Sequence, residues 1–483
     1  MKLSAIQIQS IVDATKTPTP EQVRVIEAPR RPLLVVAGAG SGKTETMSMR
    51  VLWLLANHAD LTPASILGLT FTRKAAGELG DRLRERIRLL SREMPQMRER
   101  LDEDPVALTY NSFAERIVSE HGMRIGIDPD FSMLSEAGAL DMMTQIVEAW
   151  PTDLDEELRP IDAVPQVLHL AGELAEHGFT VERAREALEE LGRELSQVGD
   201  TNAEARSLLR ANRRRLAFLG PIATYQQRKR EMGVLDFSDQ LVLATRIVRE
   251  APAVRAALRE EFRAVLLDEF QDTSVIQMEL LSTLFGDHAV TAVGDPNQAI
   301  YGWRGASASS LETFLDRFQT GAPEAGQTLT LSTAWRNDVS ILDAANRVAA
   351  PLREVASYQQ GKDALKAQSP VLVPRDGAGQ GTVEIAYTQV YEDALAATVD
   401  FVKRVRSQAT KDGKRRTVAV LSRRRKDFPF IDAALREAGI PTEIVGLGGL
   451  LDQPAVQDVR AALELAYDVA ASPWLARLLA GID

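Results

Sequence analysis

The residues best suited to bind a phosphate form one short loop, Ala37-Gly38-Ala39-Gly40-Ser41-Gly42-Lys43-Thr44. They follow the apolar run Leu33–Val36, which predicts a buried strand, and precede a helical pattern, as a P-loop requires. Glycines let backbone N–H groups close around phosphate oxygens, and the helix start adds its positive dipole end. We expect Lys43 to reach the β- and γ-phosphates of a nucleotide and the Thr44 hydroxyl to ligate Mg²⁺. Ala37 replaces the first glycine of the strict pattern, so a glycine-rich turn that carries a lysine by chance is the alternative.

Two adjacent carboxylates form a second group. Asp268 and Glu269 directly follow the apolar run Ala264–Leu267, which places them at the carboxyl end of a predicted buried strand. There Asp268 is expected to bind Mg²⁺ through its water shell, and Glu269 to orient or deprotonate an attacking water. Such a pair is often only a solvated loop, but the phosphate loop in the same chain favours the catalytic interpretation.

A third group follows the apolar run Ala289–Val293. Gln298 is expected to face a γ-phosphate or its attacking water. Tyr301, Trp303 and Arg304 bring two aromatic rings and a cation close together, which is typical of a platform that stacks single-stranded bases. Such stacking contributes about 1–3 kcal/mol per base. For Trp303, filling of the apolar core is the alternative.

The composition indicates a multidomain protein without thiol chemistry. The chain has 483 residues, more than one hydrophobic core normally supports. Its net charge of −11 argues against indiscriminate coating of nucleic acid, but it is compatible with a local basic channel. The absence of cysteine excludes disulfides, thiolate metal sites and cysteine nucleophiles. The sequence shows no secretory signal and no apolar run of membrane-spanning length, so we expect a cytoplasmic protein with no membrane partner.

Short apolar runs must position these groups, and they predict a parallel α/β fold. Ile66–Thr70, Ala264–Leu267 and Ala289–Val293 are typical of parallel strands covered on both faces. Residues 126–219 show only helical, acidic patterns and predict an all-helical insertion. A second α/β pattern begins near Thr328–Leu331. It continues through three more predicted strands, at Thr382–Ala386, Thr417–Leu421 and Thr442–Val445.

In their order, these groups resemble the motifs of superfamily 1A DNA helicases of the UvrD/Rep/PcrA type and of the related motor subunits of AddAB/RecBCD/AdnAB-class helicase–nucleases. The matching segments are Gln22 (Q motif), Ala37–Thr44 (motif I), Phe71–Ala76 (Ia), Thr109–Phe113 (Ib), Tyr225–Asp239 (the approach to motif II), Asp268–Thr273 (II), Val293–Ala306 (III) and Leu331–Asn337 (IV). Arg73 and Asn111 replace residues that are usual in motifs Ia and Ib, and Ala334 and Asn337 depart from motif IV.

The resemblance implies two RecA-like P-loop domains with parallel sheets. The first would carry an all-helical insertion (1B), and the second would reach the start of another insertion (2B). The implied boundaries are 1–125 and 220–326 for motor domain 1A, 126–219 for 1B, 327–450 for motor domain 2A and 451–483 for the start of 2B.

The resemblance also implies a function, that of a DNA-stimulated ATPase and helicase moving 3′→5′. Its cofactors would be ATP and Mg²⁺, and its partners single-stranded DNA and single/double-strand junctions. Gln22 would contact the adenine, and Trp335 would stack on it. Arg336 would face the γ-phosphate and act with Glu269 and Gln298 in catalysis. The residues that would bind DNA are Phe71, Thr72, Tyr110, Tyr301, Trp303 and Arg304.

Motifs V and VI of the family are not found before Asp483, so we expect an N-terminal part of a longer helicase that hydrolyses ATP poorly by itself. One alternative is the motor arm of a helicase–nuclease that processes double-strand breaks with a partner subunit, which the stretch Val445–Leu451 weakly favours. The other is a non-hydrolysing ATP switch that binds DNA. The intact Lys43, Asp268, Glu269 and Gln298 argue against this second alternative.

Overall fold

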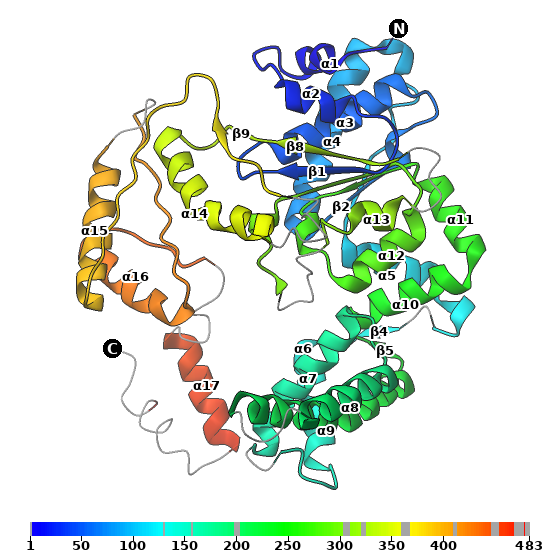
Figure 1. Cartoon of the computed structure of the whole chain (residues 1–483), viewed down its shortest axis with the longest axis vertical. Coiled ribbons are helices and arrows are strands. Elements are labelled where there is room, and N and C mark those ends of the chain that lie inside the picture. The colour runs from blue at the N-terminus through cyan, green and yellow to red at the C-terminus, as the bar shows by residue number, and fades with distance from the viewer. Residues whose placement is uncertain are drawn as a thin grey trace. The chain divides into compact units, whose positions relative to one another are not determined.

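The computed structural model describes residues 2–128, 131–155, 158–197, 203–302, 310–319, 325–358, 368–408, 413–445, 454–467 and 478. Its contacts divide the chain into two compact units, residues 1–382 and 383–483. Figure 1 shows the elements of both units. Within the described residues, no helix is both long and apolar enough to cross a membrane.

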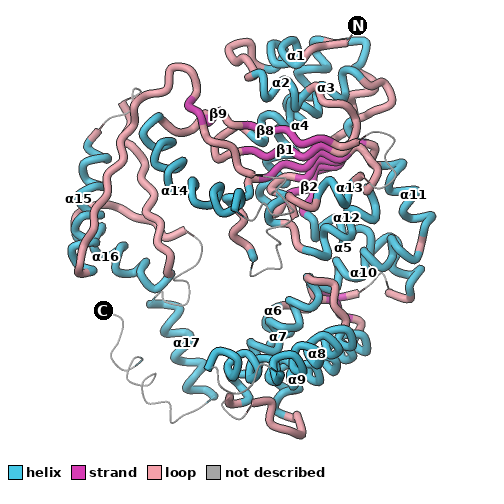
Figure 2. The backbone as a smooth tube through the Cα atoms, in the orientation of Figure 1, coloured by secondary structure: helices cyan, strands magenta, loops and turns pink. Residues whose placement is uncertain are grey.

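A six-stranded parallel sheet is the centre of the first unit (Figure 2). Its strand order is β3-β2-β6-β7-β1-β8. The strands are β1 (Leu33–Ala37), β2 (Ile66–Thr70), β3 (Val106–Thr109), β6 (Ala264–Leu267), β7 (Val290–Gly294) and β8 (Gln327–Leu331). Strands β1, β2, β6 and β7 are buried along their whole length, as their uninterrupted apolar runs predict. The predicted α/β fold with a parallel sheet is confirmed.

Helices cover both faces of this sheet (Figure 1). Alternate residues of β1 face opposite sides: Leu34 and Val36 join one apolar cluster, and Leu33 and Val35 join the other. The first cluster includes residues of α5 (Tyr110–His121), α10 (Phe237–Glu250), α11 (Pro252–Glu261), α12 (Val275–Phe285) and α13 (Phe314–Phe318). The second includes residues of α1 (Ala5–Val12), α2 (Pro20–Ile26), α3 (Lys43–Asn57) and α4 (Arg73–Glu93). The strands' carboxyl ends therefore share one open edge, where loops can gather functional groups.

Strand β8 corrects the predicted start of the second α/β pattern. It pairs in parallel with β1, with Leu33 opposite Gln327 and Ala37 opposite Leu331. We predicted that residues from 327 onward belong to a second motor domain, because a new apolar run begins there. The local run does not reveal which strand it pairs with, since that depends on contacts far away in sequence. The first sheet therefore includes residues up to Leu331.

After β8 the chain adds a smaller pair of strands to the first unit. Strand β9 (Thr333–Ala334) pairs in parallel with β10 (Val373–Pro374). Helix α14 (Val339–Tyr358) lies between them in the sequence. The segment with β10 thus returns to the residues that directly follow β8.

The described residues between the short strands β4 (Ser132–Met133) and β5 (Val234–Leu235) form helices and no further strand. The helices are α6 (Glu136–Glu148), α7 (Pro160–Glu176), α8 (Val181–Gln197) and α9 (Ala203–Met232). These helices enclose an apolar core of their own that includes Met143 and Ile222. The sequence predicts a helical segment here, but α9 continues past the expected end at residue 219.

The second unit contains α15 (Tyr391–Ser407), α16 (Phe428–Glu437) and α17 (Pro454–Tyr467). Val402, Leu435 and Ile440 form its small core. The strands predicted at 382–386, 417–421 and 442–445 are wrong for this structure, because the described residues there form no ladder. Ile385 and Leu421 are each 92% exposed. A strand needs a neighbour for its backbone N–H and C=O groups, and an apolar run does not supply one. A second RecA-like sheet stays a prediction.

Candidate active site

The predicted phosphate loop leaves the sheet at the carboxyl end of β1 and enters α3. Gly40 and Gly42 have φ of 75° and 81°, the left-handed region that side chains rarely adopt. At Gly38 a Cβ would lie 2.2 Å from the end of the Leu372 side chain, so a larger residue there would require that side chain to move. Ser41 is buried, and its hydroxyl has no hydrogen-bond partner among the described residues. The loop therefore fits a phosphate, which its N–H groups and this hydroxyl would surround.

Trp335 and Arg336 lie beside this loop. The backbone N–H of Trp335 donates to the Gly40 carbonyl over 2.8 Å. A Cβ on Gly40 would lie 3.1 Å from the Arg336 Cβ. A Cβ on Gly42 would lie 3.2 Å from Gln22 Nε2. Because Gln22 Oε1 caps the start of α2, the amide presents its NH₂ group to the loop. The resemblance assigns Trp335 and Arg336 to the second motor domain, residues 327–450. In this structure they directly follow β9 and lie in the first unit, beside the phosphate loop.

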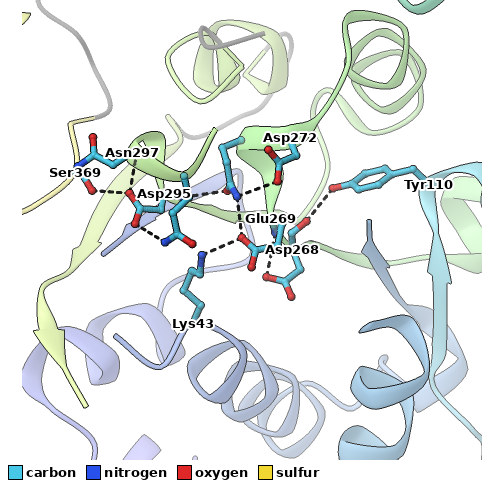
Figure 3. Close-up of polar contacts among 10 residues, drawn as sticks. Lys43, Tyr110, Asp268, Glu269, Asp272, Asp295, Asn297 and Ser369 are labelled. Atoms are coloured by element: carbon cyan, nitrogen blue, oxygen red, sulfur yellow. Dashed lines mark hydrogen bonds and ion pairs between the residues drawn. The ribbon is translucent and has the colours of Figure 1, made fainter. Parts of the chain in front are cut away.

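The two predicted catalytic carboxylates follow β6 (Figure 3). Glu269 Oε2 accepts from Lys43 Nζ over 2.9 Å and from Gln271 Nε2 over 2.8 Å. Glu269 has φ of 49°, the one positive φ of a non-glycine residue within the described chain. Strain of this kind is found where a backbone must aim a side chain. Burial and the Glu269 carboxylate raise the pKa of Asp268 to about 6, so this edge of the sheet favours a bound cation.

Asp268, which directly follows β6, lies near Thr44 of α3. Both line one small cavity, together with residues of α3, α4 and β6. The described residues contain no group of three or more histidine or carboxylate side chains that could hold a metal by themselves. Mg²⁺ is usually held by one or two carboxylates together with substrate phosphates and water. The pair therefore fits an ion that arrives with a nucleotide.

Asp295, which follows β7, connects Gln298 to the catalytic carboxylates (Figure 3). Asp295 is 2% exposed. Its Oδ2 accepts from Gln298 Nε2 over 2.6 Å, and its N–H donates to Gln271 Oε1 over 3.1 Å. The Gln271 NH₂ group in turn donates to Glu269. A continuous network of hydrogen bonds therefore runs from Lys43 to Gln298.

A cleft of about 450 Å³ opens at the carboxyl ends of β2 and β3. Phe71 lies in its wall and stacks on Tyr301, with ring centroids 5.4 Å apart and 18° between the ring planes. Polar residues share this wall, among them Thr72, Arg73, Asn111, Ser112 and Gln240. Aromatic rings beside polar groups in an open cleft are typical of single-strand binding. Residues of motifs Ia and Ib therefore lie together with Tyr301 in this structure; that they bind DNA stays a prediction.

Two of the residues predicted to bind DNA also have local structural roles. Tyr110 is buried, and its hydroxyl donates to the Asp268 carbonyl over 3.3 Å. Its ring packs edge-on against Phe71, with centroids 6.4 Å apart. Thr72 Oγ1 accepts from the Ala75 N–H and so caps α4. Tyr110 thus links the cleft wall to the end of β6. Trp303 and Arg304, predicted beside Tyr301, lie outside the described residues.

The site also contains residues that sequence reasoning missed. Phe237, the first residue of α10, is 56% exposed and lines the same cleft as Phe71. The sequence contained a signal for Phe237, because an aromatic residue directly after the helix cap Asp236 is poorly placed to join an apolar core. The sequence analysis did not single out Gln271 and Asp295, because their role is to form hydrogen bonds with other site residues, which a sequence does not show. Their position just after β6 and β7 was the available signal.

A family model described as UvrD/REP helicase N-terminal domain matches residues 18–319. DNA helicase II of Escherichia coli (strain K12) is 27% identical over 448 residues, which cover 92% of this chain and 54% of that protein. DNA helicase II of Salmonella typhimurium gives the same values, 27% over 448 residues. ATP-dependent DNA helicase PcrA of Leuconostoc citreum is 25% identical over 448 residues, or 92% of this chain and 52% of that protein. The chain spans about half the length of the curated relatives that it matches.

Proposed function

Because the chain belongs to the UvrD/REP helicase family, we propose that it carries the ATP-binding and DNA-binding parts of an ATP-dependent DNA translocase. Its substrates would be ATP with Mg²⁺ and single-stranded DNA, including junctions with duplex. The observation that carries this proposal is the continuous network from Lys43 to Gln298 beside the cleft of Phe71 and Tyr301. The 3′→5′ direction rests on the resemblance alone.

The residues of the network suggest how hydrolysis would begin. Lys43 is held by Glu269 through an ion pair of 2.9 Å. The phosphates of a nucleotide would compete for Lys43, and its transfer to them would leave the Glu269 carboxylate free to orient or deprotonate a water. Gln271 would keep Glu269 in place during this exchange, because it donates to the same carboxylate. Mg²⁺, held by Thr44 and Asp268, would supply charge neutralisation at the phosphates.

The segment after β7 would couple the ATP site to DNA. Gln298 belongs to the network of the ATP site, and Tyr301, three residues later, stacks on Phe71 in the DNA cleft. A base that inserts between these two rings would separate them, because the rings cover each other in this structure. Movement of Tyr301 would therefore reach Gln298 through a very short length of backbone. This arrangement supports DNA stimulation of ATP hydrolysis.

Replacing Tyr301 with Ala is expected to weaken binding of single-stranded DNA about 5-fold to 100-fold, because one stacked base contributes about 1–3 kcal/mol. Binding of blunt duplex should change less, since paired bases do not offer their faces. Fluorescence anisotropy with a labelled oligonucleotide measures both. Tyr387→Ala is the matched control, because Tyr387 is 96% exposed in the second unit. Equal single-strand affinities for the Tyr301 variant and the parent would contradict the stacking role.

Turnover by these 483 residues is expected to be slow. Arg336 is the arginine that the motifs place near the phosphate loop, and the resemblance would place a second arginine finger in motif VI, which we do not find in these 483 residues. An arginine finger contributes about 10³–10⁵ to turnover. DNA-stimulated kcat should therefore lie at least about 10³-fold below that of DNA helicase II of Escherichia coli, measured in parallel. Comparable turnover would show that the chain needs no further finger.

Two alternatives remain in view. A motor arm of a helicase–nuclease would use the same ATP site and would need a partner subunit. A pull-down from a lysate of the source organism would reveal that subunit. A non-hydrolysing ATP switch is disfavoured by the arrangement of Lys43, Glu269 and Gln271, which is intact for catalysis. Measurable hydrolysis that Glu269→Gln removes would exclude the switch.

A further inference from the structure

One segment outside the recognised motifs enters the ATP site. We call residues Ser369–Arg375, which include β10, the strap. The strap is fixed by Asn346 of α14, whose side-chain amide makes two hydrogen bonds of 2.9 Å to the backbone of Leu372. The Val373 N–H donates to the Ser332 carbonyl over 3.0 Å, which continues the pairing of β9 with β10. The strap is therefore a defined element that is held from both sides.

The first residue of the strap bonds to the network of the ATP site. Ser369 Oγ donates to Asp295 Oδ1 over 2.6 Å (Figure 3). Ser369 is 7% exposed and Asp295 is 2% exposed, so this hydrogen bond is shielded from water. The other Asp295 oxygen, Oδ2, is the acceptor for Gln298. One carboxylate thus joins the strap to the residue that faces the nucleotide.

The middle of the strap contacts the phosphate loop at Gly38. The Leu372 side chain lies so close to Gly38 that a Cβ on that glycine would be 2.2 Å away. Arg375, at the end of the strap, donates to the Asn337 carbonyl over 3.1 Å. The strap therefore contacts the segments of motifs I, III and IV, and it belongs to none of them.

We propose that Ser369 is a positioning residue for recognition of the γ-phosphate. It acts through Asp295: with Ser369 on Oδ1, the carboxylate has a fixed rotation and presents Oδ2 to Gln298. Without that donor, Asp295 keeps the Asn297 N–H on Oδ1 but can turn within its site. Gln298 then loses its fixed orientation toward a third phosphate. This inference rests on the proposed function, since it assumes that ATP binds at the loop.

The proposal gives the strap a role in communication along the chain. After Arg375 the backbone runs to residue 382, where the first unit ends. The strap is thus part of the covalent path from Asp295 to the second unit. A displacement of the segment after Arg375 would reach Ser369 only through Arg375 and Leu372, which have their own hydrogen bonds to Asn337 and Asn346. Triphosphate recognition would in this way depend on the state of the segment that leaves the first unit.

The experiment compares the affinity for a non-hydrolysable ATP analogue with the affinity for ADP, both with Mg²⁺, by isothermal titration on the whole chain. Threonine keeps the hydroxyl of serine, whereas valine has the shape of threonine without it. We expect Ser369→Thr to keep the parent's preference for the triphosphate. Ser369→Val and Ser369→Ala should reduce that preference about 5-fold to 10-fold, while the affinity for ADP changes less than about 2-fold.

The control is Ser340→Ala, which removes one hydroxyl contact, to Gln380 Nε2, in the same unit. It should leave the ratio of the two affinities unchanged. Thermal unfolding of each variant checks that the fold persists, and the Thr/Val pair keeps packing equal. If the parent prefers the triphosphate and Ser369→Val shows the same ratio of the two affinities, the inference about Ser369 is overturned and the proposed function stands. If the parent binds neither nucleotide, the proposed function is overturned and the inference with it.

Discussion

Replacing Lys43 with Ala is expected to weaken nucleotide binding about 10-fold to 100-fold, because a charge-assisted hydrogen bond contributes about 1.5–3 kcal/mol and tenfold corresponds to about 1.4 kcal/mol. The structure adds a second reason. Lys43 is the cation that neutralises Glu269 over 2.9 Å. Its loss would leave the carboxylates of Asp268 and Glu269 facing the phosphates without the lysine that offsets their charge, and burial together with Glu269 already raises the pKa of Asp268.

Titration with a fluorescent ATP analogue measures this effect. Lys74→Ala is the matched control, because the Lys74 side chain is 87% exposed and lies 3.9 Å from Glu78. The control should bind nucleotide like the parent protein. Equal affinities for the Lys43 variant and the parent would remove the phosphate-loop assignment, and with it the proposed ATPase.

The sequence was sufficient for the parts of the fold that depend on local pattern. Strands β1, β2, β6 and β7 were predicted because parallel strands buried on both faces need unbroken apolar runs. Since every strand of such a sheet runs the same way, the residues that follow them had to meet at one edge. That geometry explains why Lys43 and Glu269 were expected together and lie 2.9 Å apart.

The sequence was insufficient where long-range pairing decides. Strand β8 looked like the start of a new domain, and only its pairing with β1 assigns it to the first sheet. The sequence likewise does not reveal when a charged side chain is buried. Arg50 is 1% exposed within α3, and its NH1 group donates to the carbonyls of Val25 and Ala28 over 2.9 and 2.8 Å. Burial lowers the pKa of Arg50 to about 9, so the guanidinium stays charged at neutral pH. An arginine in a helix gives no such signal.

The candidate site shows the same difference between residues that the sequence reveals and residues that only long-range contacts reveal. Residues that would touch the ligand have types that reveal them, as Lys43 and Tyr301 do. Residues that hold these in place do not, because a serine such as Ser369, far from any motif, is ordinary in sequence. Its hydrogen bond to Asp295 depends on the return of the chain after α14, which no local pattern predicts.

The second large effect concerns Glu269. Glu269→Gln is expected to lower the rate of ATP hydrolysis about 10²–10⁴-fold, the usual contribution of a general base, or roughly 3–5 kcal/mol of the barrier. Nucleotide binding should persist or become tighter, since the Lys43 ammonium no longer has a carboxylate competing with the phosphates. This combination separates Glu269 from Lys43, whose loss weakens binding itself. Gln271 can still bond to the new amide oxygen, so the strained backbone at residue 269 keeps its support.

Single-turnover hydrolysis with the enzyme in excess is the measurement for Glu269→Gln, because it isolates the chemical step even when turnover is slow. Glu78→Gln, at an exposed position on α4, is the control and should hydrolyse ATP at the parent's rate. The decisive comparison is between binding and rate in one variant. If Glu269→Gln lost binding and rate together, the residue would serve to shape the phosphate loop through Lys43. Retained binding with a lost rate requires that the carboxylate act on the water, which is the step that the positive φ of Glu269 and its bond to Gln271 prepare.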